Sequence, residues 1–201
     1  MWKGSAFPAW IFASFAARLR LPDADEDVRA PSMKDRRIII IGFMGCGKTT
    51  VAAAVARRLG CAMIDLDSFI TDREGHTPAE IIVQDGEPSF REIETRALKV
   101  VLEENAARVI ALGGGAWTIA ANRALVAQHD CLSVWLDAPF ELCWERITAS
   151  GTNRPMAPDR ERAQALYDSR RWAYGLAQTR IDSISGKGLD EMVIEVETHL
   201  K

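Results

Sequence analysis

Several features are scarce or missing in this sequence of 201 residues, and each absence excludes a class of protein. The four cysteines (Cys46, Cys61, Cys131 and Cys143) form no C-x-x-C pair, which argues against a zinc site or a disulfide framework and is typical of a reducing compartment. Lys and Arg number 25 against 28 Asp and Glu, and the pI is near 5.7, so the chain has no positive field to attract nucleic acid. The apolar stretch from Ala6 to Ala17 is shorter than the roughly 20 residues that span a membrane.

The overall composition is that of an ordinary globular protein. Hydrophobic residues make up 48% and charged residues 26%, which excludes intrinsic disorder as the class of the whole chain. The length predicts one domain, large enough to bury roughly 70% of its unfolded surface without a staple.

The first 32 residues differ in character from the rest. Lys3 precedes the apolar stretch, and an acidic run from Asp23 to Asp27 follows it. We expect residues 1–32 to be a poorly ordered extension of a domain at 33–201, with Met33 as an alternative start. A signal peptide is disfavoured because no clean A-x-A site follows, and a peripheral amphipathic helix or targeting arm remains an alternative.

In the rest of the chain, strand-like runs alternate with helical patterns. The run Ile38–Ile41 is typical of a strand buried on both faces, and Gly60 provides a left-handed cap for the helix before it. Strands are predicted at residues 38–41, 62–66, 108–112, 131–136 and 180–184, and helices at 49–59, from 77, and at 89–104, 141–148, 160–178 and 189–200. This alternation predicts an α/β fold with a parallel sheet covered on both faces.

The segment Gly42–Thr49 matches the pattern G-x-x-x-x-G-K-[ST] without a mismatch, between a predicted strand and a predicted helix. Its glycines let consecutive backbone N–H groups face one anion, and the helix directs its positive end at the same point. Lys48 can neutralise phosphate oxygens, and the Thr49 hydroxyl can ligate Mg²⁺. The sequence therefore predicts a nucleoside triphosphate site.

Two carboxylates, Asp65 and Asp67, end the second predicted strand. Ligands of open α/β folds bind at this carboxyl edge of the sheet, and alternate residues of a strand share a face, so the two can serve one site. A purely structural alternative is that Asp67 caps a helix beginning at Ser68.

Other residues indicate the acceptor of the phosphoryl group. Arg91 lies in the first turn of a predicted helix, against the helix dipole, and so calls for a ligand or an acidic partner. Gly113–Gly115 directly follow the third predicted strand, which suggests close backbone approach to a ligand. Arg154 lies in a loop that would cover the phosphates, and Arg170 lies on the helix after it.

This set of motifs resembles the shikimate kinase family over residues 38 to about 184. The motifs are Gly42–Thr49, Asp65-x-Asp67, Gly86-Glu87 with Phe90-Arg91 and Glu94, Gly113–Gly115, Asn153-Arg154-Pro155, and Arg170-x-x-x-Tyr174. The resemblance implies a P-loop kinase fold: a five-stranded parallel sheet in three layers, a substrate-binding helical region and a mobile lid. It also implies transfer of a phosphoryl group from ATP to the 3-hydroxyl of shikimate, with Mg²⁺, by a cytoplasmic monomer.

The resemblance also implies roles for individual residues. The positions for ATP binding are Gly45, Cys46, Gly47, Lys48, Thr49, Thr50, Arg146 and Arg154, of which Arg146 packs near adenine and Arg154 faces the transferring phosphate. Those for the metal are Thr49 and Asp65, and those for shikimate are Asp67, Arg91, Gly113, Gly114, Gly115 and Arg170. Lys48, Asp67 and Arg154 are the implied catalytic residues, with Asp67 as the candidate base and the two arginines Arg91 and Arg170 as the carboxylate clamp.

Two segments depart from the family pattern. Met156-Ala157 stands where two leucines are usual, and Trp172 stands where a proline is usual. Both lie around the expected lid. Two alternatives to shikimate phosphorylation remain. One is a kinase for another carboxylated polyol such as gluconate, and the other is a nucleotide-binding regulatory relative without turnover.

Overall fold

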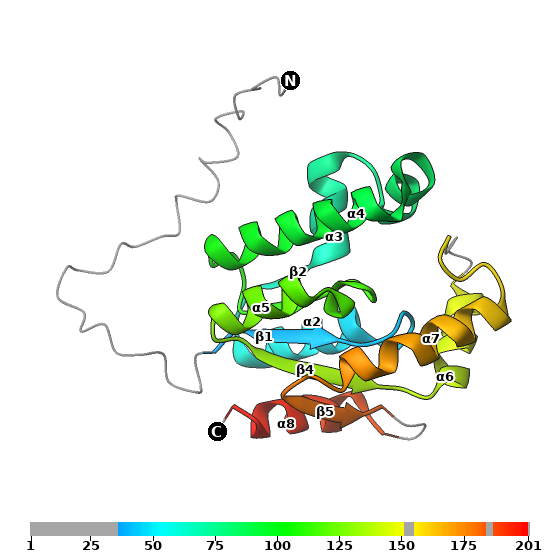
Figure 1. Cartoon of the computed structure of the whole chain (residues 1–201). Coiled ribbons are helices and arrows are strands. Elements are labelled where there is room, and N and C mark those ends of the chain that lie inside the picture. Colours follow the sequence, from blue (N-terminus) through cyan, green and yellow to red (C-terminus); the bar gives the residue numbers. More distant parts are fainter. Residues whose placement is uncertain (1–35, 151–154, 184–186, 201) are drawn as a thin grey trace. The chain divides into compact units, whose positions relative to one another are not determined.

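The computed structural model describes residues 36–150, 155–183 and 187–200, and its centre is a five-stranded parallel sheet. The strands are β1 (Ile38–Ile41), β2 (Met63–Asp65), β3 (Val109–Ala111), β4 (Leu132–Asp137) and β5 (Thr179–Asp182), in the order β2-β3-β1-β4-β5 (Figure 1). The predicted fold class is thus confirmed. The expected extension at 1–32 and the tip of the expected lid at 151–154 lie outside the described residues.

Burial along the strands follows from their places in the sheet. β1 is the central strand, paired with β3 and β4, and all four of its isoleucines are at most 1% exposed. β5 is an edge strand, in which buried and exposed residues alternate. A continuous apolar run is therefore needed only where helices cover both faces of a strand.

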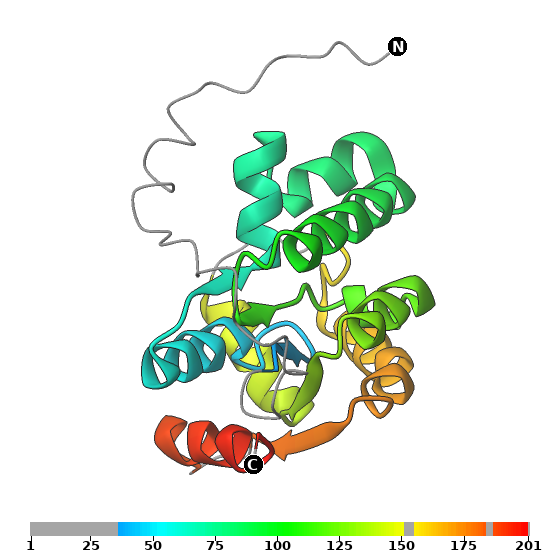
Figure 2. The same cartoon turned by 90° about the vertical axis from the view of Figure 1, so that its left-hand side faces the viewer.

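Helices cover both faces of the sheet. They are α2 (Lys48–Leu59), α3 (Leu66–Glu74), α4 (Pro78–Glu103), α5 (Ala120–Gln128), α6 (Phe140–Ala149), α7 (Arg160–Tyr174) and α8 (Leu189–Thr198), with a 3₁₀ turn at Ala116–Thr118. In Figure 2, α2 (cyan) and α8 (red) lie on one side of the sheet, and α5 (yellow-green) and α7 (orange) lie on the other. No helix in the described part of the chain is both long and apolar enough to cross a membrane.

The helices differ from the prediction in three places. α3 was considered only as an alternative, and it begins at Leu66, inside the strand predicted at 62–66. α5 lies where no helix was predicted, because only Asn122 and Val126 of its nine residues are buried and its apolar periodicity is weak. α7 ends at Tyr174, four residues before the predicted end, and the chain turns there through Gly175.

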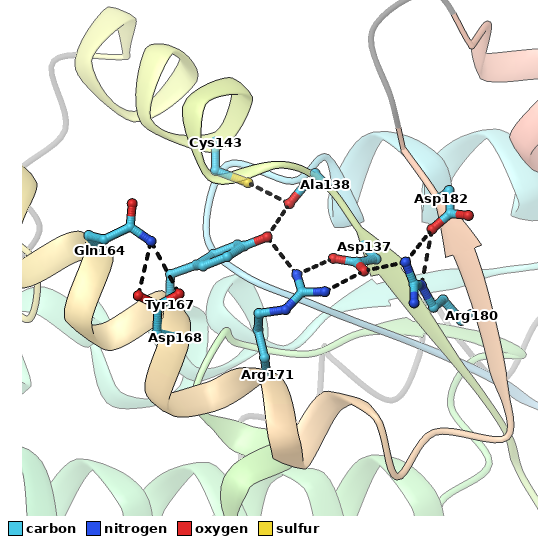
Figure 3. A network of polar contacts seen from close by, with 9 residues as sticks. All are labelled: Asp137, Ala138, Cys143, Gln164, Tyr167, Asp168, Arg171, Arg180 and Asp182. Carbon is cyan, nitrogen blue, oxygen red and sulfur yellow. Dashed lines mark hydrogen bonds and ion pairs between the residues drawn. The ribbon is translucent and has the colours of Figure 1, made fainter.

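A network of polar contacts attaches α7 to the sheet (Figure 3). Arg171 donates from Nη1 and Nη2 to the two carboxylate oxygens of Asp137 at 2.6 and 2.9 Å, and Arg180 lies 3.0 Å from the same carboxylate. Tyr167 Oη donates to the carbonyl oxygen of Ala138 at 2.8 Å. Asp137 is only 7% exposed, and both arginines form ion pairs with it. These contacts join α7, β4 and β5.

A break at Gly86 divides α4 into the two helices that the sequence predicts. Thr77 and Glu80 form the predicted capping box at the first one. Gly86 has φ 85° and ψ 161°, a conformation that is essentially restricted to glycine. Pro88 follows in the first turn of the second part, where its missing N–H group costs little. The break lets the second part approach the carboxyl edge of the sheet with Arg91 in its first turns.

Replacing Gly86 by Asn is expected to lower the free energy of unfolding by about 1–3 kcal/mol, because Asn has a Cβ atom that this conformation excludes. Gly60→Asn is the matched control: Gly60 has φ 61° and ψ 33°, a left-handed conformation that Asn tolerates, and its Cβ would meet no atom within 4 Å. Chemical denaturation of both variants measures the difference. Equal losses of stability would contradict the assigned strain at Gly86.

Candidate active site

The phosphate loop links the carboxyl end of β1 to α2. Gly47 is the N-cap of α2, and Lys48 folds back so that Nζ donates to the carbonyl oxygen of Phe43 at 3.0 Å. A cavity of about 580 Å³ lies over this loop. Every described residue predicted to bind ATP lines it: Gly45, Cys46, Gly47, Lys48, Thr49, Thr50 and Arg146. Arg154, the remaining one, lies outside the described residues.

The loop presents positive electrostatic potential to this cavity. The first N–H groups of α2 point out of the helix, and Gly47 has no side chain to cap them. Arg146 extends from α6 and donates from Nη1 to the carbonyl oxygen of Gly45 at 3.2 Å. Burial raises the pKa of the Cys46 thiol, so Cys46 behaves as a small apolar spacer of the loop.

Asp65 makes two sets of contacts at the end of β2. One carboxylate oxygen, Oδ1, accepts from the backbone N–H groups of Asp67 and Ser68 at 3.1 and 3.2 Å, and so caps α3. The other, Oδ2, accepts from Thr49 Oγ1 at 2.6 Å. The helix cap that was considered for Asp67 therefore belongs to Asp65, because α3 begins at Leu66, two residues before the expected start at Ser68.

Thr49 and Asp65 fit the requirements of a magnesium ion bound with phosphates. Both present oxygen, the donor that Mg²⁺ prefers, and both line the nucleotide cavity beside Lys48. Among the described residues no cluster of three or more His, Cys, Asp or Glu could hold a metal by itself. This set suits Mg²⁺, which usually binds through one or two carboxylates, substrate phosphates and water.

A second cavity, of about 280 Å³, adjoins the first. Each residue predicted to bind the acceptor lines it: Asp67, Arg91, Gly113, Gly114, Gly115 and Arg170. Met44, Asp67 and Gly114 line both cavities, so Asp67 lies at the junction between the donor and acceptor sides.

Arg91 is held by two carboxylates of its own helix. Its Nη2 donates to Glu87 Oε1 at 2.9 Å, and its Nη1 donates to Glu94 Oε2 at 2.8 Å. The sequence left open whether Arg91 pairs with acids or faces a ligand. The structure shows the pairs with acids, and the same side chain also lines the second cavity. The pairs fix the guanidinium group while leaving part of it exposed to the cavity.

Glu94 is a buried acid at this site, with 0% exposure. The pKa of its carboxyl group is raised to about 7, chiefly by burial and also by the charge of Asp67, whereas Arg91 opposes the shift. Its Oε1 has no hydrogen-bond partner among the described residues. A buried carboxyl group in this state titrates near neutral pH.

Two of the three consecutive glycines, Gly113 and Gly115, leave no room for a side chain. A Cβ atom on Gly113 would lie 2.6 Å from Glu94 Oε1 and 2.7 Å from Asp67 Oδ1, and one on Gly115 would overlap the guanidinium group of Arg91. Glycine at these two positions therefore allows the backbone to approach the charged side chains closely.

The acceptor cavity also has an apolar wall that the sequence analysis did not assign. Phe90, Ile82, Pro155 and Met156 contribute to it, so Met156 of the unusual Met156-Ala157 pair faces this cavity. Trp172 is instead 63% exposed, beneath the guanidinium of Arg123.

The ion pair between Glu94 and Arg91 could have been predicted from their i, i+3 spacing on a helix. The burial of Glu94 could not, because it depends on residues far away in the chain.

Comparisons with known proteins agree with this geometry. A family model described as shikimate kinase matches residues 44–201. A shikimate kinase of Streptomyces avermitilis is 39% identical over 160 residues, which cover 78% of this chain and 90% of the relative.

Solved structures give the same result. A shikimate kinase from Acinetobacter baumannii, in complex with shikimate, superposes with a TM-score of 0.73 at 30% identity, over 81% of this chain and 91% of that one. A gluconokinase from Sinorhizobium meliloti matches with a TM-score of 0.52 at 20% identity, over 83% of this chain and 91% of that one, a likeness of fold alone. The family match, the sequence identity and the two adjoining cavities together place this chain in the shikimate kinase family.

Proposed function

We propose that the protein transfers the γ-phosphoryl group of ATP to the 3-hydroxyl group of shikimate, which gives shikimate 3-phosphate and ADP. The observation that carries this proposal is the position of Asp67, which lines both the cavity over the phosphate loop and the cavity that contains Arg91 and Arg170. A carboxylate at this junction can contact an acceptor hydroxyl next to the terminal phosphate.

On the donor side, the chain supplies positive charge to the phosphates. Lys48 and the N–H groups at the start of α2 bind the β- and γ-phosphate oxygens. Thr49 and Asp65 hold Mg²⁺ together with those phosphates. The ion, when bound, neutralises charge on the transferring group.

On the acceptor side, two arginines determine the orientation of the substrate. Arg91 and Arg170 bind the shikimate carboxylate, because planar guanidinium groups match a carboxylate at two points each. Asp67 then accepts a hydrogen bond from the 3-hydroxyl and takes its proton as that oxygen attacks the γ-phosphorus. Since both reactants are held in line, positioning supplies most of the acceleration.

Three further parts of the proposal concern the whole chain. Arg154 contacts the transferring phosphate from the lid. Residues 1–32 form an extension outside the catalytic domain, which is supported by the position of all the site residues beyond Gly42.

The protein acts in the cytoplasm, which is supported by its four free thiols. It acts as a monomer, which is supported by the two cavities, since residues of one chain line both of them.

The acceptor is tested by ADP release from MgATP with shikimate or gluconate. We expect turnover that requires shikimate and none with gluconate, because gluconate lacks the ring that fills the cavity between Asp67 and the two arginines.

Lys48→Ala should lower kcat by about 100-fold or more while the fold is retained, because the variant lacks the cation that neutralises the charge developing on the phosphates. Lys99→Ala, an exposed lysine on α4, is the control and should stay within about twofold. Gluconate-dependent turnover, or an active Lys48→Ala variant, would contradict the assignment.

The carboxylate clamp is tested by Arg91→Lys and Arg91→Ala. Lysine keeps the charge but loses the planar fork, so both variants should raise the KM for shikimate by about 30-fold or more and change the KM for ATP by no more than about twofold. Arg96→Lys, an exposed arginine on the same helix, is the matched control. Steady-state kinetics with each substrate varied in turn separates the effects. A small and equal change for both substrates would show that Arg91 only pairs with Glu87 and Glu94.

The buried acid predicts a pH dependence of stability. Because Glu94 has a pKa of about 7 in the folded protein and a lower one in the unfolded chain, the folded state binds its proton more tightly. Its contribution to stability is complete at low pH and is lost as the pH rises through about 7. Relative to wild type, Glu94→Gln should therefore gain about 1–3 kcal/mol in unfolding free energy between pH 5 and pH 8.

Urea denaturation at several pH values measures this difference. Glu92→Gln, which changes an exposed glutamate on the same helix, is the matched control and should follow wild type. Parallel pH curves for wild type and Glu94→Gln would be inconsistent with the raised pKa.

A further inference from the structure

Helix α7 carries two buried tyrosines, Tyr167 and Tyr174, whose hydroxyl groups contact different parts of the protein. Tyr174 is 1% exposed, and its Oη donates to the carbonyl oxygen of Gly114 at 2.5 Å. The same hydroxyl also interacts with the guanidinium group of Arg170, one turn earlier on the helix. One hydroxyl group thus joins a cation of the acceptor cavity to the glycine loop after β3.

The two groups that Tyr174 joins are close to each other. Arg170 Nη1 would lie 3.5 Å from a Cβ atom built on Gly114, so the guanidinium group lies against the backbone of this glycine. Both residues line the acceptor cavity. Tyr174 lies behind them and is not among the residues that line it.

Arg170 differs from Arg91 in what holds it. Arg91 forms ion pairs with two carboxylates, whereas the structure gives Arg170 no ion pair with a carboxylate among the described residues. Arg170 is only 7% exposed, and this burial lowers its pKa, which its contact with Tyr174 opposes. A neutral hydroxyl partner restrains the guanidinium group and leaves its charge available to an anionic ligand.

We propose that Tyr174 is a positioning residue: its hydroxyl group fixes Arg170 against Gly114 and thereby sets the position from which Arg170 binds the carboxylate of the acceptor. This inference rests on the proposed function of the site. Tyr174 contacts neither substrate, and it acts only through Arg170 and Gly114.

The chemistry of the hydroxyl group explains why phenylalanine cannot replace it. A tyrosine hydroxyl has one O–H donor, which the carbonyl of Gly114 receives, and lone pairs that attract the neighbouring guanidinium group of Arg170. Phenylalanine keeps the ring and its packing against Trp135. It leaves the carbonyl of Gly114 without its donor and the guanidinium group of Arg170 without the neighbouring oxygen. The guanidinium group then loses its fixed direction, at the cost of affinity for the carboxylate.

The test is Tyr174→Phe, with Tyr167→Phe as the matched control. Tyr167 lies on the same helix, and its hydroxyl also donates to a backbone carbonyl, that of Ala138, and contacts an arginine, Arg171 (Figure 3). Both variants therefore lose the same kind of contacts. We expect Tyr174→Phe to raise the KM for shikimate about tenfold and to leave kcat and the KM for ATP within about threefold. Tyr167→Phe should leave both KM values within about twofold.

A structural role and a positioning role give different results here. Thermal unfolding of both variants is measured together with the kinetics. If Tyr174 only supports the fold, the two variants lose stability alike and neither changes the KM for shikimate selectively. That result, or an equal rise of this KM in both variants, would overturn the proposal.

A double variant tests the path through Arg170. Arg170→Lys already removes the planar group that Tyr174 directs, so Tyr174→Phe in this background should change the KM for shikimate by no more than about twofold. A further tenfold rise would mean that Tyr174 acts by another route and would overturn the proposal. Wild-type turnover is recorded first. If it does not depend on shikimate, both the proposed function and this inference are wrong. If the wild type is active and Tyr174→Phe has an unchanged KM for shikimate, only the inference is refuted.

Discussion

Parallel strands all end at the same edge of their sheet, and the arrangement of this site depends on that constraint. The phosphate loop follows β1, the two aspartates end β2 and begin α3, and the glycine loop follows β3. In the sheet, Asp65 pairs with Ala111, which also pairs with Ile40, so the three loops leave at nearly the same level. Residues more than 70 positions apart in the sequence therefore line adjoining cavities. The helices provide the rest of the walls.

The second constraint is the burial of charge. The acceptor cavity contains two arginines with different neighbours: Arg91 donates to two acidic side chains, and Arg170 lies beside the hydroxyl group of Tyr174. Glu87 and Glu94 accept hydrogen bonds from Arg91, although part of its guanidinium group stays exposed to the cavity. Arg170 keeps its charge, at an energetic cost that a bound anion would offset. Arg91 and Arg170 can together bind one carboxylate. In the free protein only Arg170 then lacks an acidic partner within the described part of the chain, because Arg91 is paired with Glu87 and Glu94.

Features that depend on local sequence could be predicted. The four isoleucines of β1, the glycine-rich phosphate loop and the capping box at Thr77 are each determined by neighbouring residues, and the structure contains all three. The cap of α3 was considered for Asp67 and belongs to Asp65, because both aspartates are good caps and sequence alone does not determine where β2 ends. The burial of Glu94 and the contact between Tyr174 and Gly114 link segments that are distant in the chain, so no local pattern could indicate them.

The two oxygens of Asp65 make the result of a substitution at this position depend on the residue chosen. Alanine would remove the cap of α3 as well as the oxygen that faces Thr49, so a loss of activity could arise from a displaced Asp67 as readily as from a lost metal ligand. Asparagine caps helices about as well as aspartate, yet it carries no charge to offer a cation. The geometry of one side chain therefore separates two roles that a simple truncation would confound, and asparagine is the informative replacement.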